Sequence, residues 1–207
     1  KEGDAPVIAT LDAGVPGALP LETVLALWPV TLGKGARDFG KQRVLAGTAR
    51  GARARLTLQR DSFAQGHLRG ADLDVTFAVD GARVKFLDDL PPVENASGTG
   101  RLTGNSFKVV LDKADYAGWV VSEGLVDFPA FNPRGTEFRV FAKGRGPARN
   151  IVRTLAQSRL AFGLDPARVS GDAEMTYEMF RPARDNVAYE DMRFTGSGTV
   201  RNGGIKG

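Results

Sequence analysis

The segment ADLDVTFAVDG, residues 71–81, alternates apolar and polar side chains with a period of two. Its apolar members are Leu73, Val75, Phe77 and Val79, and aspartate or threonine mostly stands between them. This spacing predicts a β-strand with one apolar face and one polar face. Such a strand is stable only when something covers its apolar face, and that requirement constrains the fold more than any other feature of the sequence.

The same alternation recurs along most of the chain after residue 43. It is clear at 53–58, 107–111, 137–142, 169–179 and 192–200. Glycine is abundant, with 26 in 207 residues, which fits many strands separated by turns. The pattern predicts roughly ten to twelve strands, with hairpin turns at Asp80-Gly81 and at Gly104-Asn105.

Helical spacing is confined to short segments. Residues 20–29 place Leu21, Val24, Leu25 and Trp28 on one side, and residues 34–43 predict a second short helix. A third helix is predicted near 147–158, because Pro147 suits a first helical turn and an apolar stripe begins at Ile151. We therefore expect one segment over 1–207, with loop and short helices at 1–43 and a β-sheet with one helix at 44–207.

The predicted sheet is too large for these helices to cover. Ten strands at about 4.8 Å spacing and ten residues at about 3.3 Å each give a face of about 50 Å by 33 Å, on the order of 1,600 Å². A 12-residue helix is about 18 Å long and about 10 Å wide, so it hides roughly 200 Å². Soluble monomers rarely expose more than a few hundred Å² of contiguous apolar surface.

Two folds would cover the apolar surface that the helices leave exposed. The sheet closes as a sandwich or barrel and buries the apolar positions as core, or it curls into an open trough that holds an apolar ligand. A strand of about 33 Å bent at its middle has arms of about 16 Å, which matches the roughly 15 Å hydrocarbon depth of one membrane leaflet. Periodicity alone does not choose between the two.

The composition argues against several kinds of chemistry. The chain has no cysteine and one histidine, His67, in a polar turn, so thiol chemistry, cysteine metal sites and a histidine cluster are excluded. The 28 basic and 24 acidic residues are interspersed, which does not favour nucleic-acid binding. No phosphate-binding loop or catalytic constellation is present, and no apolar run is long enough to span a membrane. We therefore expect no enzyme activity, no metal and no cofactor.

Three segments resemble the YhdP/AsmA-like proteins of the Gram-negative cell envelope. They are LWPVTLGKGARDF, with Trp28-Pro29 and Gly35-Ala36-Arg37; VKFLDDLPPVENASGTGRLTGNSFKVVLD; and KGRGPARNIVRTL. The order and spacing match from about Pro20 to the end. Phe39 stands where tryptophan is expected.

The resemblance implies the trough: a mainly β fold with a long, strongly curled antiparallel sheet, an open apolar groove, and two or three short helices. It also implies a periplasmic location, an inner-membrane anchor outside this sequence, and phospholipid transport towards the outer membrane. The expected partners are a phospholipid or other acyl-chain ligand, and further parts of the same chain at both ends. The helix near 147–158 would act as a lid or plug.

Under this interpretation the alternating apolar positions line the groove. They are Leu56, Leu58, Leu73, Val75, Phe77, Val79, Val84, Phe86, Phe107, Val109, Leu111, Phe138, Val140, Met175, Tyr177 and Phe194. The alternatives left open are a closed β-sandwich that serves envelope assembly as a structural or protein-interaction module, and a carbohydrate-active β-enzyme.

Overall fold

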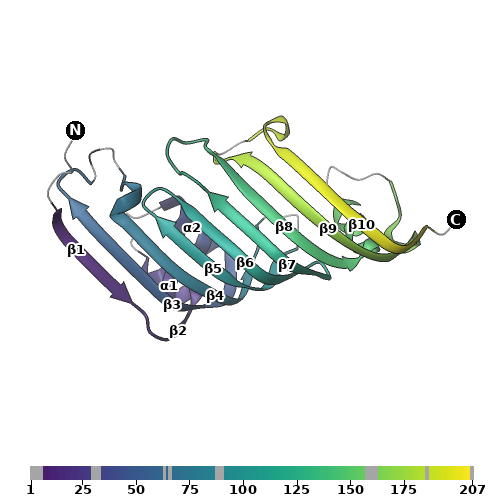
Figure 1. Ribbon diagram of the computed structural model, residues 1–207, viewed down its shortest axis with the longest axis horizontal. Helices are drawn as coiled ribbons and strands as arrows, with labels where there is room; N and C mark the ends of the chain where they lie inside the picture. The colour runs from purple at the N-terminus through teal and green to yellow at the C-terminus, as the bar shows by residue number, and fades with distance from the viewer. Residues whose placement is uncertain are drawn as a thin grey trace.

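A computed structural model describes residues 7–28, 34–62, 64, 67–86, 91–156, 163–184 and 187–205. These residues form one antiparallel sheet of ten strands, in the order β1-β3-β4-β5-β6-β7-β8-β9-β10, with β2 paired to β3 off this path (Figure 1). The strands are β1 (Val7–Gly14), β2 (Ala18–Pro20), β3 (Val44–Gln59), β4 (Leu73–Val84), β5 (Val93–Thr103), β6 (Phe107–Tyr116), β7 (Trp119–Phe128), β8 (Glu137–Pro147), β9 (Val169–Pro182) and β10 (Arg193–Ile205).

The sheet is open. β1 and β10 are its edge strands and lie at opposite ends of the long axis (Figure 1). From β3 onwards each strand pairs with the next strand in sequence, as short hairpin connections favour. The closed-sandwich alternative is wrong for the described part of the chain, because no second sheet packs against the first there.

The three predicted helices are present as α1 (Leu21–Leu27), α2 (Lys34–Arg43) and α3 (Ala148–Ala156). α1 and α2 contact β3, and α3 contacts β9 and β8. In Figure 1 α1 and α2 lie behind the sheet, so they pack on one of its faces. No described helix is both long enough and apolar enough to cross a membrane.

The hairpin predicted at Asp80-Gly81 is wrong, because β4 continues through this point. Its pairing register with β5 shifts between Val79 and Ala82, and Gly81 has a φ of 60°. These features define a β-bulge, in which one strand carries extra residues and bends without reversing. A hydrogen bond from the Ser97 hydroxyl and the nearby charge of Arg50 lower the pKa of Asp80, so this carboxylate stays ionised on the bulge.

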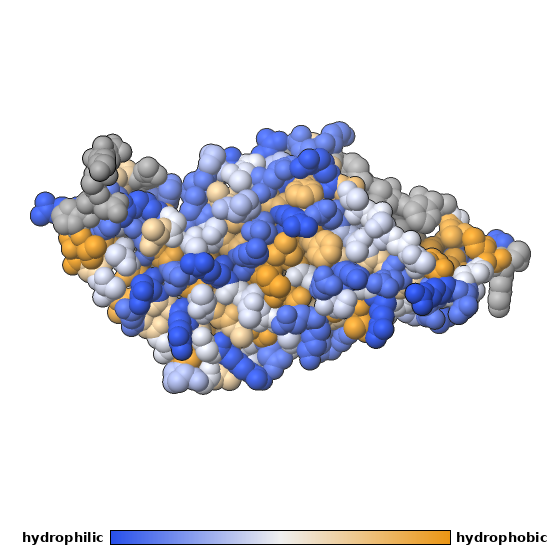
Figure 2. Space-filling model, in the orientation of Figure 1, coloured by the Kyte–Doolittle hydropathy of each residue, from blue (hydrophilic) through white to orange (hydrophobic). Residues whose placement is uncertain are grey.

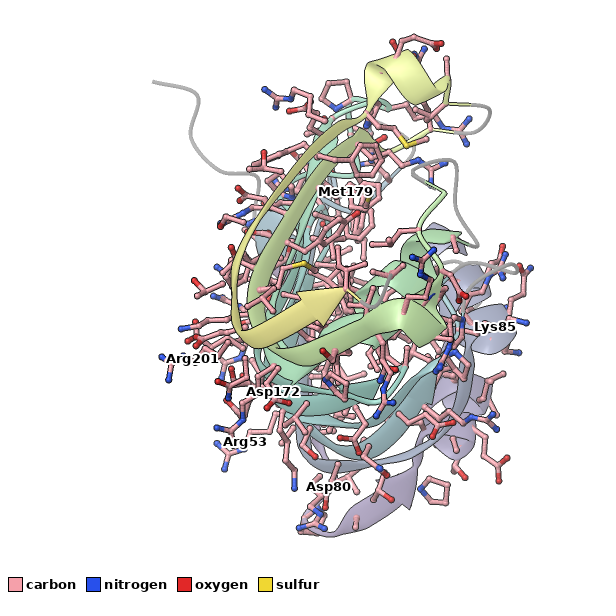
Figure 3. The ribbon with its side chains drawn as sticks, turned by 90° about the vertical axis from the view of Figure 1, so that its right-hand side faces the viewer. Arg53, Asp80, Lys85, Asp172, Met179 and Arg201 are labelled. Carbon is pink, nitrogen blue, oxygen red and sulfur yellow. The ribbon has the colours of Figure 1, made fainter. Side chains whose placement is uncertain are left out.

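Bulges also interrupt neighbouring strands at about the same level. The register shifts between Arg50 and Arg53 in β3, and between Glu94 and Ser97 in β5. Bulges bend strands and increase local twist. Figure 3 shows the strands arched when the sheet is viewed along its long axis.

Some glycines are required where neighbouring strands approach closely. A Cβ on Gly98 would lie 2.1 Å from the Val110 carbonyl oxygen, and one on Gly198 would lie 2.7 Å from the Glu174 carbonyl oxygen. Both contacts are with backbone, which cannot move aside like a flexible side chain. These glycines therefore allow β5 to lie close to β6 and β10 to lie close to β9.

The buried core is divided into small clusters. One contains Leu68, Leu73 and Leu102, and another contains Ala82, Ala96 and Ala114, against which Leu21 of α1 packs. A third contains Trp119, Ala148 and Ala173, with Ile151 of α3 beside it. Most buried positions carry small side chains, and the larger apolar residues of the sheet remain half-buried.

A buried ion pair fixes the loop before β4. Asp72, which is 2% exposed, accepts hydrogen bonds from the Arg69 backbone N–H at 3.1 Å and from the Arg69 guanidinium at 2.7 Å. Burial alone would raise the pKa of Asp72. The hydrogen bonds from Arg69 and Ser62 outweigh it and hold the pKa below the ordinary value of 3.8.

We predict that Gly98→Ala destabilises the protein by about 1–3 kcal/mol, because the new methyl group overlaps the backbone of β6. Urea unfolding at neutral pH measures the change. Gly17→Ala is the control, since a Cβ there meets nothing within 4 Å. Equal stability of the two variants would show that β5 and β6 can separate to admit a side chain.

We also predict that Asp72→Asn lowers the free energy of unfolding by about 1–3 kcal/mol at pH 7. Because the folded-state pKa of Asp72 is depressed, its contribution is complete above the unfolded pKa and disappears as pH falls through the folded pKa. The difference between wild type and variant should therefore shrink below about pH 4.

Urea titrations across this range test the pH dependence. Asp74→Asn removes an exposed ion pair with Arg101 and should have a much smaller effect at every pH. A difference for Asp72→Asn that stays constant from pH 7 to pH 2 would contradict the prediction.

Candidate functional site

The pairing register divides the sheet into two faces of different character. We call the face on which the helices pack the inner face and the opposite one the outer face. In Figure 3 Met179 lies on the side of the helices, whereas Arg53, Asp172 and Arg201 project from the other side. The two faces are therefore distinguished by both packing and polarity.

Cross-strand ion pairs cover much of the outer face. They include Arg55–Asp12 at 2.7 Å, Arg101–Asp74 at 2.7 Å, Lys143–Glu174 at 3.3 Å and Arg193–Glu137 at 2.7 Å. Opposite charges on paired strands stabilise the register modestly. Figure 2 shows this face, where hydrophilic side chains alternate with hydrophobic patches.

A shallow, open hollow of about 760 Å³ lies largely on the outer face. Arg50, Arg101 and Lys108 contribute to its lining, and each of them pairs with an aspartate of a neighbouring strand. Its basic groups are thus already neutralised, and the hollow offers no free charge for an anion.

The inner face carries aliphatic, aromatic and glycine positions in continuous cross-strand rows. One row runs Leu73, Leu56 and Leu11 towards β1. Another runs across five strands as Val109, Val126, Val140, Met179 and Phe194. This continuity gives an apolar surface that spans the sheet rather than isolated hydrophobic side chains.

An aromatic cluster lies at one end of the inner face. Phe128 stacks on Phe138 with ring centroids 4.3 Å apart, and Phe107 and Phe131 lie 6.5 Å and 6.2 Å from Phe128. The loop that carries Phe131 is fixed by Asn105, whose Oδ1 accepts hydrogen bonds from the N–H groups of Phe131 and Asn132. The aromatic rings are therefore held at this end of the strands.

The predicted lining residues fall on the inner face, with one exception. Pairing or packing places there Leu56, Leu58, Leu73, Val75, Phe77, Val79, Val84, Phe107, Val109, Leu111, Phe138, Val140, Met175, Tyr177 and Phe194. Phe86 lies beyond the end of β4, is 39% exposed, and contacts Phe39 of α2 with ring centroids 6.0 Å apart. Whether these residues contact a ligand stays a prediction.

Burial separates these residues into packed and accessible ones. Leu73 is 6% exposed and belongs to the cluster with Leu68 and Leu102, so it serves as core. Most of the others are half-buried, including Val109, Val140 and Tyr177. In a protein of this length such residues would normally be covered by a second layer.

The helices cover only parts of this face. α1 places Leu21 over Ala82, Ala96 and Ala114, and α3 packs near Ala148 and Ala173. Among the described residues the helices contact mainly β3, β8 and β9, and none packs extensively on β6 or β7. Figure 3 likewise shows the helices on one side of an arched sheet, with Met179 inside the arch.

Several inner-face positions were not predicted from the sequence. Phe128 and Val126 were not predicted because Gly124 made the facing of residues 119–128 ambiguous, although their pairing with Phe107 and Val109 resolves it. Met179 continues the alternation through Met175 and Tyr177. Arg181 also lies on this face, and the apolar pattern gave no signal for it.

His67, predicted to lie in a solvated loop, is half-buried in a loop, with Nδ1 3.0 Å from the Leu68 carbonyl oxygen. Within the described ranges, no group of three or more His, Cys, Asp or Glu side chains is arranged to hold a metal ion. The feature that stands out is therefore the inner face itself, which defines a single-sheet β-protein with an incompletely covered apolar surface.

A comparison with known protein families identifies the family of this chain. The model of the family described as YhdP protein matches residues 21–202, so the chain belongs to the YhdP family. The match includes strands β3 to β9 and all three helices. No curated protein matches the chain, and no solved structure does.

Proposed function

We propose that this chain is a periplasmic section of a lipid-transport protein, and that its inner face shields phospholipid acyl chains during passage between the inner and outer membranes. Membership of the YhdP family supports an envelope role. The observation that carries the proposal is the continuous, half-buried apolar inner face, on whose middle strands β6 and β7 no helix of the described ranges packs extensively.

The chemistry of the inner face suits this role. Moving an acyl chain from water to an apolar surface gains about 0.8 kcal/mol per CH₂ group, so a chain in water is strongly driven onto such a face. Transfer from a membrane requires only that the face match the apolarity of the bilayer interior. Rows of valine, methionine and phenylalanine such as Val109, Val140 and Phe194 provide that environment.

We further propose that the sheet curls around its ligand as an open trough. The bulges near Arg50–Arg53 and Glu94–Ser97 bend the strands, and glycines such as Gly98 allow the backbones to approach. An arm of five residues on one side of a bulge spans about 16 Å, which is comparable with the roughly 15 Å depth of one leaflet. The proposed trough therefore accommodates tails while its edges face water.

The proposal includes an inner-membrane anchor outside this sequence and assigns the chain no catalytic step. The ion-paired outer face, with Arg101–Asp74 as an example, fits contact with the aqueous periplasm. Neither a metal nor a cofactor is required, because shielding a hydrocarbon chain involves no covalent change.

We predict that a photoreactive amino acid at position 109 crosslinks to phospholipid in cells, whereas the same residue at position 110 does not. Val109 and Val110 are neighbours on β6, but Val109 belongs to the inner face and Val110, which is 43% exposed, belongs to the outer face. Mass spectrometry of the crosslinked protein identifies the adduct.

The two positions form a matched pair in residue type, strand and depth along the sheet. Equal labelling at both would mean that the protein contacts lipid non-specifically. If position 109 gives no lipid adduct although protein levels are normal, the transport proposal is contradicted and a structural role is favoured. Val109→Asp and Val110→Asp provide a second comparison, since only the former should reduce the lipid that co-purifies with the protein.

A further inference from the structure

Charged residues are almost excluded from the inner face. Along β4 to β10, the register places the described acidic and basic side chains on the outer face or at bulges, with Arg181 the exception. Arg181 pairs with Phe138 of β8 and follows Met179 by two positions on β9. It therefore shares the face of Met179, the labelled residue inside the arch in Figure 3.

The guanidinium of Arg181 is incompletely satisfied. Its Nε is buried and has no hydrogen-bond partner, and no carboxylate in the described part of the chain forms an ion pair with it. Other arginines of the sheet have such partners, for example Arg139 with Glu178 and Arg193 with Glu137. A buried, unpaired donor on a cationic group is unfavourable for folding, so its presence calls for an anionic partner from outside.

The position of Arg181 indicates which part of a ligand it meets. It is the penultimate residue of β9, at the same end of the strands as the aromatic cluster around Phe128 and Phe138. We call this end the rim. α3 packs near Ala173, eight residues away along β9, or about 26 Å. An acyl chain lying between rim and helix would leave its polar end beside Arg181.

We infer that Arg181 binds the phosphate of a phospholipid whose acyl chains lie on the inner face, and so holds the headgroup at the rim. This inference rests on the proposed function. A guanidinium presents paired N–H donors that match phosphate oxygens in a bidentate geometry. The Arg181 Nε is buried and the residue pairs with the apolar Phe138, and such a poorly hydrated setting strengthens charge-assisted hydrogen bonds.

The test compares two ligands with identical tails. The protein is incubated with detergent-solubilised dioleoylphosphatidylglycerol or dioleoylglycerol, and the lipid retained after gel filtration is measured by mass spectrometry. We expect wild type to retain the phospholipid about tenfold more tightly than the neutral lipid, a typical effect for a bidentate charged contact. Arg181→Met should lose this preference and still retain dioleoylglycerol.

Matched variants separate binding from folding. Arg181→Met removes the unpaired donor and should be at least as stable as wild type in urea. Arg181→Lys keeps the charge without the bidentate donors and should keep only part of the preference. Arg201→Met, on the outer face of β10 (Figure 3), should leave the preference unchanged.

The outcomes distinguish the two proposals. If wild type retains neither lipid, the proposed function fails and the role of Arg181 fails with it. If wild type and Arg181→Met retain both lipids equally, the chain binds acyl chains but Arg181 does not recognise the headgroup. Displacement of the bound phospholipid by inorganic phosphate alone would also overturn the inference, since it would make Arg181 a site for free phosphate.

Discussion

The structure depends on backbone hydrogen bonding within one open sheet. Each strand from β3 to β10 is held by its neighbours in sequence, and the buried clusters that support them are small and rich in alanine. Cross-strand ion pairs on the outer face, such as Arg101–Asp74, help to stabilise the strand register. Because the described helices cover only parts of the inner face, its apolar side chains remain half-buried.

Small and large residues have different roles on the inner face of the sheet. Gly98 and Gly198 let neighbouring backbones approach, while the large side chains around Val109 and Phe138 project from the same face. The bulge at Gly81 bends β4 without ending it. The arch of the sheet thus follows from backbone features, which leaves the side chains of the inner face free to form a continuous apolar surface.

The amino-acid sequence predicts much of this arrangement. Period-two alternation identified the strand around Phe77, the turn at Gly104-Asn105 and the face shared by Met175 and Tyr177, because side-chain direction follows directly from the pleat. It failed at Asp80-Gly81, since a glycine with positive φ serves a bulge as well as a hairpin.

The candidate site was predictable only in part. Apolar inner-face positions can be predicted from the period-two alternation. Arg181 cannot, because a single basic residue near a strand end resembles any solvated arginine. Its significance comes from the pairing with Phe138 and the absence of a described acidic partner, and both depend on how distant segments meet. Period two also cannot say how far a face will be covered, so the half-buried state of Val140 required the structure.

The sequential strand order has a consequence for how such a protein can vary in size. Since each strand contacts mainly its immediate neighbours, inserting or deleting one hairpin would change the long dimension by about 10 Å, two strand spacings, and leave the cross-section unchanged. Span and cross-section are therefore independent properties of this architecture. The length of the sheet can therefore change in evolution through the number of hairpins, while the surface of each individual strand stays the same.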